Sequence, residues 1–437
     1  MKRQRNQSGL WRPPGIILLG LLSSFSVPAR ATAELVLQLE TSLTSDTNPF
    51  RFYDGQKDAQ QNTIERQSDK QTGTELRAGA ILPIASDRTR LILTGSLGNH
   101  HYKNYRDLDH HLSAGDASLE WAAGNAVSGR VTAGKEDRLF QYINGTLTDR
   151  DLSHQTRAGA DLNLKINNDW TVTASLDKSG LGYDLQVNKL YNFDERGKQL
   201  GIRYMSPTGS SVAVGTRLSE TVYPDRNAQQ IADLDQRYKE TEVYLDGEWR
   251  YSVKSVTSAH LGLIRRRYDS LVDNDTRLFN TLWRGTYHYS PKLRLDIQIW
   301  DRPFNIIDPT ILYVVTKGAR FDALWKWSDK TQFNFSTLLQ NSDQTLVPRL
   351  AALEDGISRK ETLQRFGVGA NYQFQRGFRL FLDSFYEKVK RESDQANLNQ
   401  AVVKLGFEYT YENLPGSAAR VGLTRYQHSL SASDALR

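Results

Sequence analysis

The stretch Phe366 to Phe374 reads FGVGANYQF and places an apolar or aromatic residue at every second position. Four further stretches alternate in the same way, namely residues 35–40, 158–166, 243–251 and 293–299. A period of two is that of an extended strand, whose side chains point alternately to two faces. The sequence therefore predicts many strands, each with one apolar face and one polar face.

Short turn-forming stretches alternate along the chain with longer polar connections. The short ones are residues 86–88, 124–126, 167–169, 207–210, 251–254, 290–292, 328–330, 375–377 and 414–417, and examples of the longer ones are 49–72, 183–196, 224–234 and 341–359. This layout is typical of outer-membrane barrels, which have tight periplasmic turns and larger external loops. We therefore predict an all-β fold, a transmembrane antiparallel up-and-down β-barrel formed by residues 34–437.

The connections separate 19 candidate strands, whereas single-chain bacterial barrels have an even number. Either the first segment (residues 34–47) or the last (residues 418–430) lies outside the closed sheet, or one of the hairpins is miscounted. The last is the better candidate, because its alternation breaks at Arg425. We predict about 18 strands, within a range of roughly 16 to 20. Side chains alone cannot fill a barrel of this size, so water or an inserted loop must occupy it.

Many aromatic residues of the apolar phase lie close to short turns. They include Trp121, Trp249, Trp283, Trp325, Trp327, Tyr289, Tyr409 and Tyr411. Trp and Tyr are enriched where a membrane protein meets the interface, so these residues predict a girdle on the periplasmic side. The alternative is a soluble all-β propeller or sandwich, which would carry polar residues on its outward positions.

Residues 1–33 have the features of a secretory signal peptide. Basic residues precede the short apolar run 15–22, and Ala29-Arg30-Ala31 and Ala31-Thr32-Ala33 are both possible cleavage sites. Cleavage after Ala33 removes five of the 56 basic residues and none of the 50 acidic ones, which leaves a net charge of +1. We therefore expect no nucleic-acid partner. The chain has no cysteine, which excludes disulfides and thiolate chemistry.

The polar phase of the strands is rich in charges of both signs. An Arg or Lys facing hydrocarbon costs about 2–4 kcal/mol at the midplane, so this phase should face a wet lumen. The candidates for lining the lumen are Arg203, Arg217, Arg250, Arg266, Arg284, Arg294, Arg320, Arg365, Arg379, Asp246, Asp296, Asp322 and Asp383. They could form cross-strand ladders that stabilise the wall, or a selectivity surface for polar solutes, acidic ones included.

The sequence contains no nucleophile elbow and no zinc-protease helix, so we expect neither an enzyme nor a cofactor. The pairs His100-His101 and His110-His111 cannot chelate as units, because neighbours in a strand point to opposite faces. One histidine of each pair could still converge across the hairpin.

Two further constellations are possible. Asp109, one histidine of the second pair and Ser113 could form a protease-like triad. Oxygen atoms of Asp46, Asn48 and Asp54 could bind calcium. Neither pattern is specific, and we predict no metal site.

The first strand runs into Asp46, Asn48, Phe50 and Arg51 in the pattern D-x-N-x-F-R. Over this stretch the chain resembles the EpsL-type outer-membrane barrels of exopolysaccharide systems, within the wider putative β-barrel porin families. The resemblance implies passage of a secreted polysaccharide through the outer membrane, with periplasmic export components as possible partners.

We therefore expect a protein of the bacterial outer membrane, in contact with its lipid, that serves as a conduit for exopolysaccharide export. Phe381 and Phe385 in the polar phase could stack on sugar faces or pack under an inward loop. One alternative is a general or solute-specific porin for a small polar solute. The second is a barrel enzyme or a structural adhesion protein.

Overall fold

The computed structural model of the 437-residue chain describes residues 32–57, 62–86, 88–140, 149–304, 308–349, 359–392 and 397–423. Most of the predicted signal peptide, residues 1–31, lies outside the described residues, as does the second half of the candidate strand 418–430.

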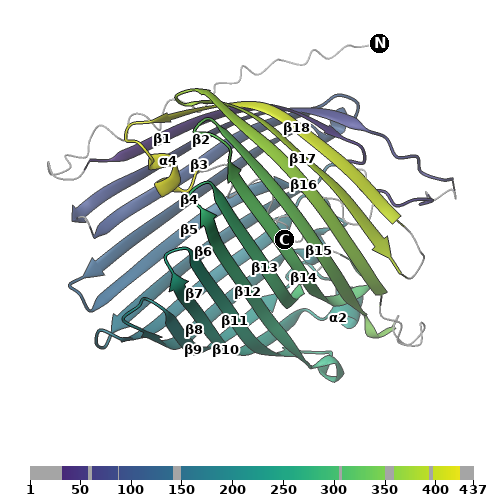
Figure 1. Cartoon of the computed structure of the whole chain (residues 1–437). Helices are drawn as coiled ribbons and strands as arrows, with labels where there is room; N and C mark the ends of the chain where they lie inside the picture. The colour runs from purple at the N-terminus through teal and green to yellow at the C-terminus, as the bar shows by residue number, and fades with distance from the viewer. Residues whose placement is uncertain are drawn as a thin grey trace, which may run out of the picture.

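The strands form one closed barrel (Figure 1). Eighteen strands pair antiparallel with their neighbours in sequence, and the last strand pairs with the first, from Val36 opposite Glu412 to Asp46 opposite Val402. The strands are β1 (Glu34–Asp46), β2 (Asp69–Ser86), β3 (Thr89–Tyr102), β4 (His110–Ala123), β5 (Val127–Leu139), β6 (Leu152–Lys165), β7 (Trp170–Tyr183), β8 (Phe193–Met205), β9 (Ser211–Val222), β10 (Arg237–Ser252), β11 (Ser255–Tyr268), β12 (Thr276–Ser290), β13 (Leu293–Phe304), β14 (Ile311–Lys326), β15 (Thr331–Leu346), β16 (Arg359–Gln375), β17 (Phe378–Arg391) and β18 (Asn397–Glu412). The predicted up-and-down barrel and its strand number are confirmed.

The helical elements are short and lie outside the sheet. Those with bounds among the described residues are the 3-10 helices η1 (Arg106–Leu108), η2 (Lys189–Tyr191) and η3 (Val272–Asn274), and the α-helices α2 (Ala228–Leu234) and α4 (Ser417–Val421). Figure 1 shows α2 and α4 at opposite ends of the strands. No helix among the described residues is long and apolar enough to cross a membrane.

Eight of the nine predicted short turns join consecutive strands, and the ninth does not. Residues 414–417 lead into α4 instead, so the strand considered over residues 418–430 does not form in its described part. The segment Ser417–Val421 contains two alanines and one arginine, which favour a helix, and left-handed glycines at 416 and 422 flank it. This removes the nineteenth strand and leaves an even number.

The exterior of the barrel is apolar, as the alternation predicts. On β1, Leu37 and Leu39 are 44% and 45% exposed, whereas Gln38 and Glu40 between them are 4% exposed. Outward aromatic residues such as Trp249 and Trp327 lie at the short-turn ends of their strands and form the predicted girdle. A closed barrel with this exterior is a protein of the bacterial outer membrane. The soluble all-β alternative is therefore wrong.

Candidate functional site

The connection between β1 and β2 folds into the barrel. We call its described residues, 47–57 and 62–68, the inward loop. Phe50 and Phe52 are 3% and 5% exposed and pack in one cluster with Phe140, Tyr183 and Tyr191 from the region of β5 and β7. Since β7 lies six strands away from β1, the loop reaches well across the interior.

The next residue of the loop, Tyr53, packs on the other side of the lumen. It forms a buried cluster with Trp300 on β13, Leu338 on β15, Val389 on β17 and Leu398 on β18, among others. Aromatic side chains from one loop thus contact inward-facing residues on two separated parts of the wall. An inserted loop, one of the two alternatives predicted for the interior of a barrel of this size, is present, and it narrows the lumen near the long-loop end.

The sequence folds inward at this point because Asn48 closes a tight turn. Its side-chain oxygen accepts a hydrogen bond from the Phe52 N–H at 2.9 Å, and its side-chain nitrogen donates to the Phe52 carbonyl at 2.9 Å. Asp46 in turn accepts from the Asn48 N–H at 2.8 Å, and Arg51 adopts a left-handed φ of 57°. These bonds are those of a turn rather than of a calcium site, since Asp46 also accepts from Gln400.

An ion pair fixes the inward loop to the wall. A guanidinium nitrogen of Arg51 lies 2.5 Å from Glu387 on β17, whose side chain is fully buried. The other carboxylate oxygen of Glu387 accepts from Arg365 Nε at 2.7 Å. A buried carboxylate between two guanidinium groups is stable because both partners are present, and losing either leaves buried charge unbalanced. The four residues of the D-x-N-x-F-R pattern are thus brought together at the base of the inward loop.

Tyr53 adds a second attachment. Its hydroxyl donates to Glu361 at 3.3 Å, and Arg391 lies over its ring at 4.2 Å. Burial, together with the nearby Glu361 carboxylate, raises the pKa of Tyr53 well above its usual value. The phenol therefore remains a neutral donor wherever the protein functions.

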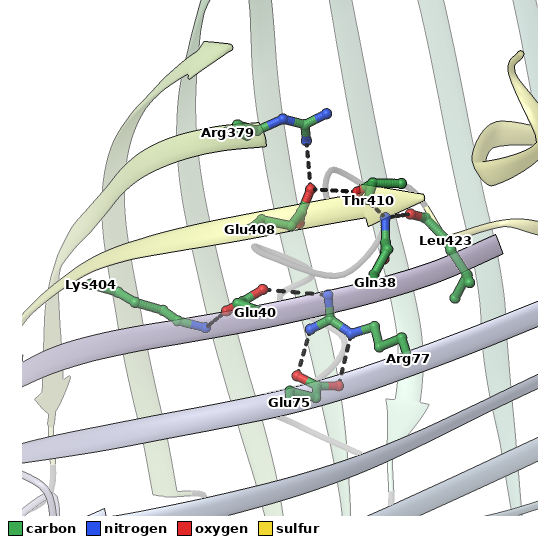
Figure 2. Close-up of polar contacts among 9 residues, drawn as sticks. All are labelled: Gln38, Glu40, Glu75, Arg77, Arg379, Lys404, Glu408, Thr410 and Leu423. Carbon is green, nitrogen blue, oxygen red and sulfur yellow. Dashed lines mark hydrogen bonds and ion pairs between the residues drawn. The ribbon is translucent and has the colours of Figure 1, made fainter. Parts of the chain in front are cut away.

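A charged network covers the wall beside the seam between the first and last strands (Figure 2). Glu40 on β1 lies 2.6 Å from Lys404 and 3.4 Å from Arg77, which also binds Glu75 on its own strand at 2.5 Å. Figure 2 shows these side chains on neighbouring strands and pointing toward one another. Here the charges stabilise the wall.

All thirteen lumen candidates lie in the inward-facing phase of their strands. Seven of the nine arginines bind carboxylates: Arg217 (Asp177 and Glu195), Arg250 (Glu248), Arg266 (Glu240), Arg294 (Asp296), Arg320 (Asp322), Arg365 (Glu387) and Arg379 (Glu408). Asp246 binds His260 at 2.7 Å, and Asp383 faces inward on β17. Within the described part of the chain, Arg203 and Arg284 have no carboxylate partner and are exposed to the lumen.

A polar cavity of about 260 Å³ lies in the lumen against β8 to β13. Its lining residues are Glu195, Arg217, Ser219, Tyr238, Glu240, Glu242, Ile264, Arg266, Asn280, Pro303 and Phe304. Arg266 is 3% exposed, donates to Glu240 at 2.8 Å and stacks over Tyr238 at 4.3 Å. Its Nη1 atom is buried and has no hydrogen-bond partner among the described residues. The two arginines of the cavity are paired with its carboxylates, Arg266 with Glu240 and Arg217 with Glu195.

The C-terminal segment occupies the opposite, short-turn end of the lumen. Val421 and Leu423 pack with the inward-facing Val36 and Ile81, and the Leu423 carbonyl accepts from Gln38 at 2.8 Å. Ser417 and Arg420 also bind Glu34. The chain thus narrows its own lumen at both ends.

One histidine of each pair meets the other across the hairpin, as the alternation of side chains along a strand predicts. His100 and His110 converge across the β3–β4 hairpin and stack with ring centroids 5.0 Å apart. Within the described residues, no group of three or more metal-ligating side chains is found.

The proposed triad is not assembled. Ser113 donates to Asp137 on β5, while Asp109 accepts from the Tyr102 N–H and contacts His101. Phe381 is 2% exposed, with a Lys404 nitrogen 5.7 Å from its ring centroid, so it offers no face to a sugar. Phe385 lies beneath Arg365 at 5.0 Å.

Comparison with solved structures finds barrels of similar extent. OccK1 (OpdK) of Pseudomonas aeruginosa is 11% identical, with 87% of this chain and 99% of that chain covered and a TM-score of 0.46. OccK2 (OpdF) of the same organism, in complex with glucuronate, is 11% identical over 87% and 98%, with a TM-score of 0.49. OccAB4 of Acinetobacter baumannii is 10% identical over 88% and 99%, with a TM-score of 0.45. At this identity the likeness concerns the fold alone.

No family model matches the chain, and no curated protein matches it. The resemblance to EpsL-type barrels, which rested on Asp46, Asn48, Phe50 and Arg51, therefore gains no support from the comparisons. In this chain those residues build the base of the inward loop.

Sequence reasoning allowed for an inserted loop and for a last segment outside the sheet, but it did not identify the two segments that narrow the lumen. A signal for the first was available, because Phe50, Phe52 and Tyr53 are aromatic residues in an otherwise polar connection. Such residues would be unfavourable in a loop that projected into water. No comparable signal marked α4, whose position depends on contacts with strands at the other end of the chain.

Proposed function

We propose that this protein is an outer-membrane porin for small polar solutes, and that solutes carrying a carboxylate group are favoured. The observation that supports this proposal best is the narrowing of the lumen by the inward loop, and the wall also contains a charged cavity of about 260 Å³. That volume suits a molecule of a few to about a dozen heavy atoms rather than a polymer. The porin alternative is therefore preferred over polysaccharide export.

The preference for acidic solutes is supported by the unpartnered donors. Arg217 and Arg266 in the cavity are each paired with carboxylates and so do not carry this preference. Nearer the short turns on the same side of the barrel, Arg203 and Arg284 have no carboxylate partner among the described residues. Guanidinium groups bind carboxylates through paired hydrogen bonds, so these residues form successive weak sites along one wall.

The test uses the purified protein in planar bilayers. In a salt gradient we expect an anion-selective reversal potential, and we expect glucuronate to cause brief blockades of the current. The double substitution Arg203→Gln and Arg284→Gln should reduce anion selectivity severalfold. The matched control is Arg90→Gln, which changes an inward-facing arginine on β3 that binds Glu120 at 2.6 Å. It should leave selectivity nearly unchanged.

Two results would overturn the proposal. One is the absence of conductance under all conditions. The other is uptake of oligosaccharides into protein-containing liposomes at the same rate as uptake of monosaccharides. That result would favour polysaccharide export over the porin function. If the channel conducts but selects cations, the proposed porin function stands and the proposed preference for acidic solutes is wrong.

A further inference from the structure

The outer face of β7 to β12 places like charges opposite each other near the long-loop end. Three cross-strand pairs are basic on both sides: Lys178 opposite Arg196, Lys239 opposite Arg267, and Arg265 opposite Arg277. Directly opposed like charges destabilise a sheet. Elsewhere on the outer face, charged partners have opposite signs, as in Asp301 opposite Lys317 and Asp343 opposite Lys360.

We call Lys239, Arg265, Arg267 and Arg277 the outer basic patch; all four side chains are exposed. Lys239 shares the carboxylate of Glu220 with Arg237, at 3.8 and 3.3 Å. The three arginines of the patch have no carboxylate partner in the described part of the chain. The protein itself therefore does not offset the repulsion between Arg265 and Arg277.

The patch lies at the edge of the apolar band. Leu263 and Phe279, the next outward residues on the same strands, are 50% and 65% exposed. Two residues of an antiparallel strand span about 7 Å, so the guanidinium groups lie at headgroup depth beside acyl chains. The patch is at the long-loop end, which in an outer-membrane barrel faces outward. Its lipid neighbours are therefore those of the outer leaflet.

We propose that the outer basic patch binds the phosphate groups of lipopolysaccharide, the phosphorylated glycolipid of the outer leaflet. A phosphate between Arg265 and Arg277 accepts paired hydrogen bonds from both guanidinium groups and converts their repulsion into attraction. The acyl chains of the same lipid lie on Leu263 and Phe279. This site is on the outside of the barrel and does not depend on what passes through the lumen.

The experiment measures binding of lipid A to the delipidated, detergent-solubilised protein by native mass spectrometry. Lipid A with two phosphates should bind, and the same lipid after enzymatic removal of both phosphates should not. The substitutions Arg265→Gln and Arg277→Gln together should weaken binding about 25-fold, from roughly fivefold for each basic residue at a membrane surface. Heat-dependent migration in gels verifies that the variant barrel is folded.

The matched control is Lys388→Gln with Lys390→Gln, which removes two outward basic residues of β17 outside the patch. It should bind lipid A like the original protein. If both double variants lose lipid A binding to the same extent, the effect is one of overall charge, and the outer basic patch is not a specific site. Unchanged binding in the arginine variant, or equal binding of the dephosphorylated lipid or of phosphatidylglycerol, would overturn the proposal as well.

Discussion

Arg51 and Glu387, separated by 336 positions in the sequence, form an ion pair of 2.5 Å that joins the inward loop to β17. Arg365 binds the other oxygen of the same carboxylate. A salt bridge between the loop and the wall therefore attaches the segment that narrows the lumen.

Breaking this ion pair should widen the channel. Arg51→Gln leaves Glu387 with one partner, so we expect a cost of about 2 kcal/mol, below the 3–5 kcal/mol of a fully broken buried pair. Glu387→Gln leaves two guanidinium groups without a carboxylate and should have the larger effect. Single-channel conductance should rise in the same order. Arg376→Gln, in the turn between β16 and β17, serves as the control and should conduct normally; equal conductance in all three variants would contradict the role of the ion pair.

Removing the C-terminal segment should open the short-turn end of the lumen. A chain that ends at Asn413 lacks α4 and should show higher conductance with an intact sheet. Gly79→Val tests the same contact without truncation, because a Cβ atom at position 79 would overlap Val421 and closely approach Leu423. Circular dichroism verifies the strand content of both proteins. If neither variant differs in conductance from the original, the segment does not limit the passage.

Displacing Trp300 should loosen the inward loop from within the wall. A Cβ atom at Gly318 would overlap the Trp300 ring, which packs against Tyr53. Gly318→Val should therefore lower the free energy of unfolding by about 1–3 kcal/mol, the usual cost of overpacking. It should also increase current noise as the loop moves. Gly247→Val is the comparison, since open space surrounds position 247; a matching loss of stability there would point to strand propensity as the cause.

The hairpin between β3 and β4 should weaken in acid. The Tyr102 N–H, which donates to Asp109 at 2.6 Å, and the neighbouring His101 lower the pKa of Asp109. A lowered folded-state pKa stabilises the fold above the unfolded value near 4, and this contribution disappears as the pH falls through the folded-state value. The protection factor of the Tyr102 amide, which corrects its exchange rate for the intrinsic slowing in acid, should fall between pH 5 and pH 3 by more than in other hairpins. In Asp109→Asn exchange at pH 7 should already be fast, and the additional acid dependence should be absent.

The strands and their faces could be predicted because both depend on local alternation. The same holds for ion pairs two residues apart on one strand, such as Arg294 with Asp296 and Arg320 with Asp322, which share a face by spacing alone. The pair of Arg217 with Asp177 could not be predicted, because it depends on the registers of β7, β8 and β9. The contacts of the inward loop and of α4 could not be predicted for the same reason, since their partners are distant in sequence.

Both segments that narrow the lumen adjoin the strands that meet at the seam: the inward loop follows β1, and α4 follows β18. The loop is attached to residues of β17 and β18, and the tail to residues of β1 and β2. Neither attachment can form before the two edges of the sheet meet. During biogenesis, these attachments across the seam therefore form only after the cylinder closes, so an assembly arrested before the final pairing would be a leak in the membrane's permeability barrier.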